Sequence, residues 1–202
     1  MRLLRCGWLF GVVVAGHMAC AQDATFSRDS LDAYWARMDA EFADSAQSPL
    51  KSEDRAHFEH LERFAPDRTY RVEAVFKQVQ KAEPFAMKTS TARLPQYKVH
   101  GTLTFTLGGQ EFTLPVYESA TPDPNYPGYL FLPFTDLTNG EETYGGGRYL
   151  DLQAPLGPVV VVDFNKAYNP YCAYSDRYSC PIPPIENHVD AQVRAGVLKF
   201  HE

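Results

Sequence analysis

The sequence contains few cysteines and, beyond its N-terminus, no long run of apolar residues. Its cysteines are Cys6, Cys20, Cys172 and Cys180 in a chain of 202 residues. A helix that crosses a bilayer needs about 20 consecutive, mostly apolar residues. No later segment has that composition, so the sequence predicts no transmembrane segment.

The sequence also lacks an excess of positive charge. Lysine and arginine number 19 against 25 aspartates and glutamates, which gives a formal net charge of −6 at pH 7. Proteins that bind nucleic acid or anionic lipid surfaces carry basic patches, because phosphate groups dominate the affinity. The composition therefore excludes nucleic acid as a partner.

No segment carries Gly-x-Ser-x-Gly, the nucleophile motif of many serine hydrolases. Catalysis by carboxylates is not excluded, because two acids need only converge in space. The acids that qualify are Asp136, Glu141, Glu142, Asp151, Asp163 and Glu186. A hydrolase that uses such a pair, or a bound metal, is one of two function classes that the sequence leaves open.

The N-terminus has the three parts of an export signal. Arg2 and Arg5 form the basic start, residues 8–15 form the apolar stretch, and residues 19–21, Ala-Cys-Ala, match the small-x-small pattern that signal peptidase cleaves. We predict a signal peptide over residues 1–21 and a periplasmic or extracellular location for the mature protein.

A lipid anchor on Cys20 is the alternative to cleavage after Ala21. The residue three places before Cys20 is His17, whereas a lipidated cysteine usually has a branched aliphatic residue there. The sequence therefore favours cleavage after Ala21 over the anchor.

Cys172 and Cys180 are the two cysteines outside the predicted leader. In an oxidising compartment an isolated pair favours a disulfide, which in so short a loop would stabilise the protein by roughly 2.5 kcal/mol. The alternative is a zinc site with His188, but the cysteine spacing exceeds the roughly two to four residues of structural zinc pairs. We expect a disulfide, no metal and no cofactor.

The spacing of apolar residues predicts helices first and strands after them. Leu31, Trp35 and Phe42 recur at helical spacing, which predicts an amphipathic helix from Ser27 to about residue 46, and a second short helix is expected from Ser52. Alternation with period two predicts strands at residues 70–76, 97–107, 112–116, 129–134, 148–152, 159–164 and 189–193. The expected fold class is mainly β (α+β), an antiparallel β-sandwich or barrel-like sheet with two N-terminal helices.

Two strands have features that predict their place in the sheet. Residues 159–164 are apolar on both faces, which indicates a central strand. Pro115 cannot donate a hydrogen bond to a ladder, so the strand that contains it should be an edge there. We expect residues 22–66, an N-terminal helical segment, and residues 67–202, a β domain, to form one globular unit.

Several unusual blocks in the second half of the chain resemble the DUF1684 family, bacterial proteins with a domain of unknown function. The blocks are Glu-Thr-Tyr-Gly-Gly-Gly-Arg-Tyr at 142–149, Asp-Phe-Asn at 163–165, Asn-Pro-Tyr-Cys-Ala-Tyr at 169–174, Cys-Pro-Ile-Pro-Pro at 180–184 and Glu-Asn at 186–187. The resemblance covers most of the mature chain. It implies no established activity.

The glycine turn that precedes Arg148 is the candidate binding site. Consecutive glycine N–H groups can form an anion-binding nest, which a guanidinium can complete. The alternative is a tight turn in which Arg148 pairs with Glu142 or Asp151. For Asp163, Asn165 and Asn169 the sequence favours local Asx turns over a calcium site, because the pattern does not fit a calcium-binding loop. The candidate ligand-binding residues are Glu142, Tyr144, Gly145, Gly146, Gly147, Arg148, Asp151, Asp163, Asn165, Asn169, Glu186 and Asn187.

The absence of catalytic motifs favours a binding or structural module of the cell envelope over a hydrolase. Its ligand would be a small anion or a carbohydrate, because sugar rings stack on aromatic side chains, although the same side chains also suit packing. The tyrosines concerned are Tyr126, Tyr129, Tyr144, Tyr149, Tyr168, Tyr171, Tyr174 and Tyr178. The sequence leaves open whether the protein is an enzyme.

Overall fold

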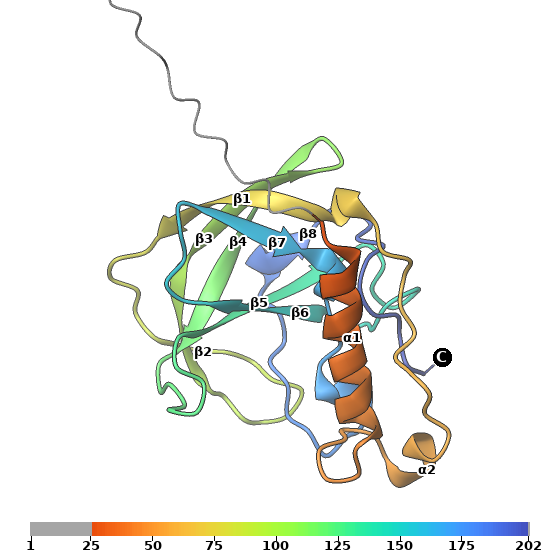
Figure 1. Cartoon of the computed structure of the whole chain (residues 1–202). Coiled ribbons are helices and arrows are strands. Elements are labelled where there is room, and N and C mark those ends of the chain that lie inside the picture. Colours follow the sequence, from red (N-terminus) through yellow and green to blue (C-terminus); the bar gives the residue numbers. More distant parts are fainter. Residues whose placement is uncertain (1–25, 202) are drawn as a thin grey trace, which may run out of the picture.

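The computed structural model describes residues 26–201, in which eight strands form a curled, half-barrel sheet (Figure 1). The strand order is β6-β5-β4-β3-β1-β7, with β2 paired to β3 and β8 to β5. The strands are β1 (Arg71–Gln78), β2 (Phe85–Ala86), β3 (Gln96–Leu107), β4 (Gln110–Ser119), β5 (Tyr129–Asp136), β6 (Arg148–Gln153), β7 (Val159–Asp163) and β8 (His188–Val189). All pairs are antiparallel except β5 with β8. A mainly β, antiparallel fold is therefore confirmed.

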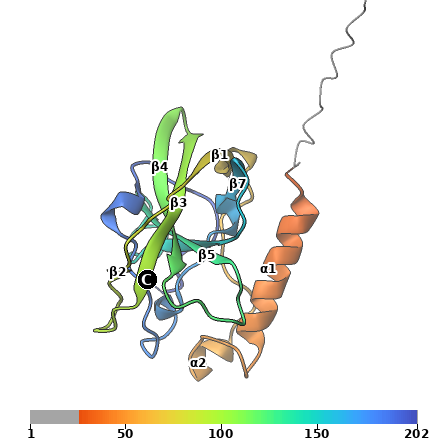
Figure 2. The same ribbon diagram turned by 90° about the vertical axis from the view of Figure 1, so that its left-hand side faces the viewer.

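One long helix, α1 (Arg28–Ala43), stands beside the sheet, and the turned view in Figure 2 shows it on one side of the strands. Ser27 caps it by accepting a hydrogen bond from the Ser30 amide at 3.2 Å. The predicted second helix is only the single turn α2 (Ser52–Arg55), and Lys51 at its N-cap makes no side-chain bond to it. Two full N-terminal helices are therefore not confirmed.

Residues 26–201 also contain four single-turn 3-10 helices, one directly before β1 and three after β7. They are η1 (Arg68–Tyr70), η2 (Phe164–Lys166), η3 (Tyr171–Ala173) and η4 (Ile185–Asn187). Helix α1 is attached to η2 by two hydrogen bonds: Trp35 Nε1 donates to Asn165 O, and the Tyr34 hydroxyl donates to Lys166 O, both at 3.1 Å. These bonds place one face of α1 over the end of the sheet.

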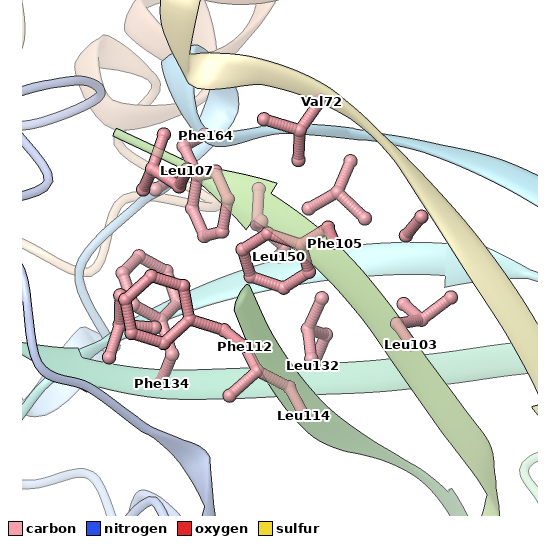
Figure 3. Close-up of a cluster of buried hydrophobic side chains, with 14 of the residues drawn as sticks. Val72, Leu103, Phe105, Leu107, Phe112, Leu114, Leu132, Phe134, Leu150 and Phe164 are labelled. Atoms are coloured by element: carbon pink, nitrogen blue, oxygen red, sulfur yellow. The ribbon is translucent and has the colours of Figure 1, made fainter. Parts of the chain in front are cut away.

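The main core lies inside the curl of the sheet, where Figure 3 shows side chains from several strands converging. Strand β3 illustrates the cause, because Leu103, Phe105 and Leu107 point inward while the threonines between them do not. Leu132 and Phe134 of β5 meet them with 0% exposure. A smaller cluster, which includes Leu31, Trp35 and Phe42 of α1, packs the helix against the C-terminal half of the chain.

The apolar sequence of β7 predicts a central strand, but the structure places β7 at the end of the sheet. It pairs only with β1, and Val159 is 54% exposed. An apolar run indicates that both faces of a strand are covered by other parts of the protein. It does not indicate whether both edges of the strand pair with neighbouring strands. Here Val161 faces a hollow beside α1, and Val162 faces the core.

Two further strand predictions are modified by the structure. The predicted last strand, residues 189–193, is reduced to β8 (His188–Val189). Strand β4 is internal in the sheet, but it pairs with β5 only at Tyr117. Near Pro115 the place of β5 is taken by Asn187, whose Nδ2 donates to Pro115 O at 2.9 Å.

The predicted leader over residues 1–21, with Cys6 and Cys20, lies outside the described residues. Within residues 26–201, no helix combines the length and hydropathy that a membrane crossing requires.

Candidate functional site

Arg148, the centre of the predicted anion site, is buried and bonded to the protein itself. Its side chain is 0% exposed. Nη2 donates to Asp136 Oδ2 and to Val193 O, both at 2.8 Å, and Nη1 donates to Ala195 O. Burial lowers the pKa of the guanidinium, and the adjacent Asp136 opposes that shift. Arg148 therefore ties the C-terminal segment to β5 and β6.

The prediction that Arg148 pairs with Glu142 or Asp151 is wrong. Successive side chains of a strand point to opposite faces, so Arg148 at the start of β6 and Asp151 three places later lie on opposite sides of the sheet. Glu142 instead accepts from Arg194 Nε at 2.9 Å on the surface.

Most of the other candidate residues make hydrogen bonds that hold the fold together. The bonds are those of Asp163 Oδ1 with the Asn165 amide (3.1 Å), Asn165 Nδ2 with Asp67 O (2.9 Å), Asn169 Nδ2 with Leu198 O (2.8 Å), and Asn187 Nδ2 with Pro133 O (2.8 Å). Tyr144 is half-buried and Glu186 is exposed. Of the twelve candidates, Asp151 and Asp163 line the hollows described below.

Gly147 is the member of the glycine turn that the fold requires. Its φ of +87° lies in the left-handed region, whereas Gly145 and Gly146 have no positive φ. A Cβ at position 147 would lie 2.7 Å from Phe134 O and 2.7 Å from Pro183 Cγ. The backbone is thus approached closely by β5 and by a proline, which supports the alternative of a structural turn.

A groove of about 520 Å³ opens among residues of α1, β5, β6 and the segment 168–181. Its aromatic lining residues are Tyr34, Tyr97, Tyr126, Tyr129, Phe131, Tyr149, Tyr168, Tyr171 and Tyr178, and its charged ones are Arg37, Glu41 and Asp151. Eight of the twelve tyrosines of the chain therefore line one hollow. We term it the tyrosine groove.

Strand alternation explains how β5 and β6 supply the floor of the tyrosine groove. Leu130 of β5 and Leu150 of β6 point into the main core. Their neighbours Phe131 and Asp151, which face each other across the β5–β6 ladder, point the other way and line the groove together with Tyr149. Period-two patterning thus builds the core and the groove from the same two strands.

Asp151 is the acid in the groove to which two tyrosine hydroxyls donate hydrogen bonds. Its Oδ1 accepts hydrogen bonds from the Tyr168 hydroxyl at 2.6 Å and the Tyr129 hydroxyl at 2.7 Å. Water still reaches the carboxyl group, since the residue is exposed, but protein atoms surround it on the other sides. This partial desolvation raises the pKa of Asp151 above its ordinary value, and the two hydroxyls oppose the shift.

A second hollow, of about 310 Å³, shares Tyr34 and Asp151 with the tyrosine groove. It also contains Arg71, Asp163 and Lys166. Among residues 26–201, no three histidine, cysteine or acidic side chains come together as ligands for a metal ion.

The outer wall of the tyrosine groove comes from α1 and from the loop that the two cysteines close. The Tyr171 hydroxyl donates to Glu41 Oε1 at 2.6 Å, which joins this loop to the helix. The structure pairs Cys172 with Cys180, whose Cα atoms are 6.1 Å apart. Cys180 lines the groove, and the loop between the cysteines carries Tyr178 to its edge.

The sequence interpretation missed the contribution of α1 to this site. The groove is lined by Tyr34, Arg37 and Glu41 of this helix, and none of the three is among the candidate residues. Arg37 and Glu41 stand three and seven residues after Tyr34, a spacing that places all three on one helix face. That spacing is the signal that could have found them, whereas nothing local identifies Tyr97 or Phe131.

Comparison with known proteins assigns the chain to a family. The family model described as "Protein of unknown function (DUF1684)" matches residues 56–198. The solution NMR structure of the uncharacterized protein from gene locus rrnAC0354 of Haloarcula marismortui is 37% identical, with a TM-score of 0.69 over 86% of this chain and 95% of that one. The aligned 86% of this chain is a longer part of it than residues 56–198, so the similarity to this structure extends into the N-terminal segment. No curated protein is significantly similar. The chain belongs to the DUF1684 family of proteins of unknown function.

Proposed function

We propose that this protein is an exported binding module that holds a small molecule in the tyrosine groove. The observation that carries the proposal is the concentration of eight tyrosines and Phe131 in one groove with the carboxylate of Asp151. Ligand sites are typically concave and lined by aromatic side chains, with a few polar groups that fix orientation. The groove has this composition, whereas the glycine turn at 145–147 is packed against the protein itself.

The groups in the groove suit binding better than hydrolysis. A carboxylate mechanism needs a second acid that acts together with the first. The other acid of the groove, Glu41, is bonded to Tyr171 on the α1 side. Asp151 is bonded to Tyr129 and Tyr168, and these bonds orient its carboxylate toward the groove.

Binding in the groove can be tested without knowing the ligand. We expect members of a fragment library to shift the backbone amide resonances of β5, β6 and residues 168–181 in protein-observed NMR. Tyr129→Ala should weaken the best fragment about two- to tenfold, because a stacked aromatic pair contributes about 0.5–1.5 kcal/mol. Tyr129 is 37% exposed, so its removal should leave the fold intact.

Leu137→Ala is the matched control, since Leu137 is an exposed apolar side chain (51%) that does not line the groove. It should leave fragment affinity unchanged. If no fragment shifts the groove resonances, or if Tyr129→Ala and Leu137→Ala behave alike, the groove is not a binding site.

Export is supported by the leader pattern and by the pairing of Cys172 with Cys180. We expect intact-mass spectrometry of the protein from the producing cells to give a chain that begins at Gln22. A chain that begins at Cys20 and carries lipid would establish the anchored alternative. A mass that includes Met1 would contradict export.

A further inference from the structure

We infer that the ligand of the tyrosine groove is an organic cation, an ammonium compound whose charge lies beside Asp151 and the two tyrosines that bond to it, Tyr129 and Tyr168. This inference rests on the proposed function and adds the chemical class of the ligand. It departs from the anion or carbohydrate that the sequence suggests. Three features of the groove support it: an uncompensated carboxylate, an exposed aromatic ring beside that carboxylate, and the distribution of charge.

The first feature is that the Asp151 carboxylate has hydroxyl partners but no cationic one. Within residues 26–201, its oxygens form no ion pair with lysine, arginine or histidine at 4.0 Å or less. Both hydroxyl bonds go to Oδ1, so Oδ2 retains its capacity to accept. A neutral ligand that displaced water here would leave a desolvated charge, which is costly, whereas a cation would compensate it.

The second feature is that an exposed aromatic ring adjoins the Asp151 carboxylate. Phe131 and Tyr149 pack edge to face with centroids 4.7 Å apart and are only 3% and 6% exposed, so they form the floor of the groove. Tyr129, which bonds to Asp151, is 37% exposed and offers its ring to a ligand. The face of an aromatic ring attracts a compact group such as trimethylammonium, and a neighbouring carboxylate adds to that attraction.

The hydroxyl bonds to Asp151 reinforce this effect. A phenol that donates to a carboxylate gains electron density on its ring, because the O–H bond is polarised toward the acceptor. The Tyr168 bond to Asp151, at 2.6 Å, is in the range of charge-assisted hydrogen bonds. The ring of Tyr168 therefore attracts a cation more strongly than an isolated phenol does.

The third feature is that the groove has one basic side chain, Arg37, against two acids. Arg37 belongs to α1 and is exposed, with its guanidinium carbon 5.5 Å from the centre of the Tyr34 ring. An anionic ligand would be drawn to Arg37 and repelled by Asp151. A cation would experience the opposite forces, so substitution of each of the two residues tests the sign of the charge on the ligand.

The test is a calorimetric titration with choline chloride and with 3,3-dimethyl-1-butanol, which has the same shape but carbon in place of the charged nitrogen. We expect choline to bind at least about tenfold more tightly, the scale of a desolvated cation–π and carboxylate interaction. Asp151→Asn should reduce choline affinity about tenfold and leave the neutral alcohol unchanged. Arg37→Gln should raise choline affinity about twofold, because it removes a repelling charge that is largely screened.

Asp151→Asn also serves as its own folding control. The folded-state pKa of Asp151 is raised above 3.8, so the ionised carboxyl destabilises the folded state at pH 7, and this cost disappears as the pH falls below 3.8. Asparagine avoids the cost and can still accept both tyrosine hydroxyls. We expect its melting temperature at pH 7 to equal or exceed that of the unmodified protein, so that lost binding reflects lost charge.

The remaining outcomes separate this inference from the proposed function. Equal affinities for choline and the alcohol, or a loss of choline binding in Arg37→Gln, would overturn the assignment of a cation. Binding of cellobiose in place of choline would overturn it as well and leave a ligand site in the groove. The absence of choline binding, with fragments still bound in the groove, rejects the cation and retains the proposed function.

Discussion

Arg148→Ala should lower the free energy of unfolding by about 3–5 kcal/mol, the cost of leaving a buried charge without its partner. The charge is that of Asp136, whose side chain is 0% exposed. The same substitution also frees Val193 O and Ala195 O, which Arg148 binds. Urea denaturation, followed by circular dichroism, measures this loss.

Arg148→Lys should cost nearly as much as Arg148→Ala. Lysine keeps the positive charge, but it cannot reproduce the planar fork with which Arg148 reaches a carboxylate and two carbonyls at once. Arg148→Met combined with Asp136→Asn should recover part of the loss, because it removes both charges together.

Arg194→Ala provides the matched control for this ion pair. Arg194 and Glu142 form a bond of similar length, 2.9 Å, but their side chains are 53% and 37% exposed. Exposed pairs contribute roughly 0–1 kcal/mol. If Arg148→Ala were no more harmful than Arg194→Ala, the buried pair would not hold the C-terminal segment in place.

Gly147→Ala should destabilise the protein by about 3 kcal/mol or more, through left-handed strain and a steric clash. The clash is with Phe134 O, a backbone atom of β5 that cannot move aside, and with Pro183 Cγ. The melting temperature measures the effect and should fall by roughly 6 °C or more for a domain of this size.

Gly145→Ala is the control within the same turn. Gly145 has no positive φ, and the nearest heavy atom to an added Cβ is Gly140 Cα at 3.7 Å, an ordinary contact. We expect a change within about 0.5 kcal/mol. Equal losses in the two variants would show that the turn needs glycine for flexibility and not for the close approach of β5 at position 147.

The sequence by itself determined the local structure of this protein wherever a pattern repeats between neighbouring residues. Alternation along residues 97–107 predicted β3 (Gln96–Leu107), and helical spacing from Leu31 to Phe42 predicted α1 (Arg28–Ala43). The blocks at 142–149, 163–165 and 169–174 indicated the family. These features depend on residues a few places apart, so periodicity is sufficient to find them.

The tertiary structure alone decided which polar residues form hydrogen bonds and ion pairs with one another. Sequence reasoning placed Arg148 either at an anion site or in a tight turn paired with Glu142 or Asp151, but the structure buries it against Asp136. Asp151 became the centre of the tyrosine groove because the β5–β6 register brings Tyr129 to it and the bridge between Tyr149 and Tyr168 brings Tyr168 to it. Such convergence is set by strand register and helix placement, which follow from the packing of the whole core and leave no local pattern in the sequence.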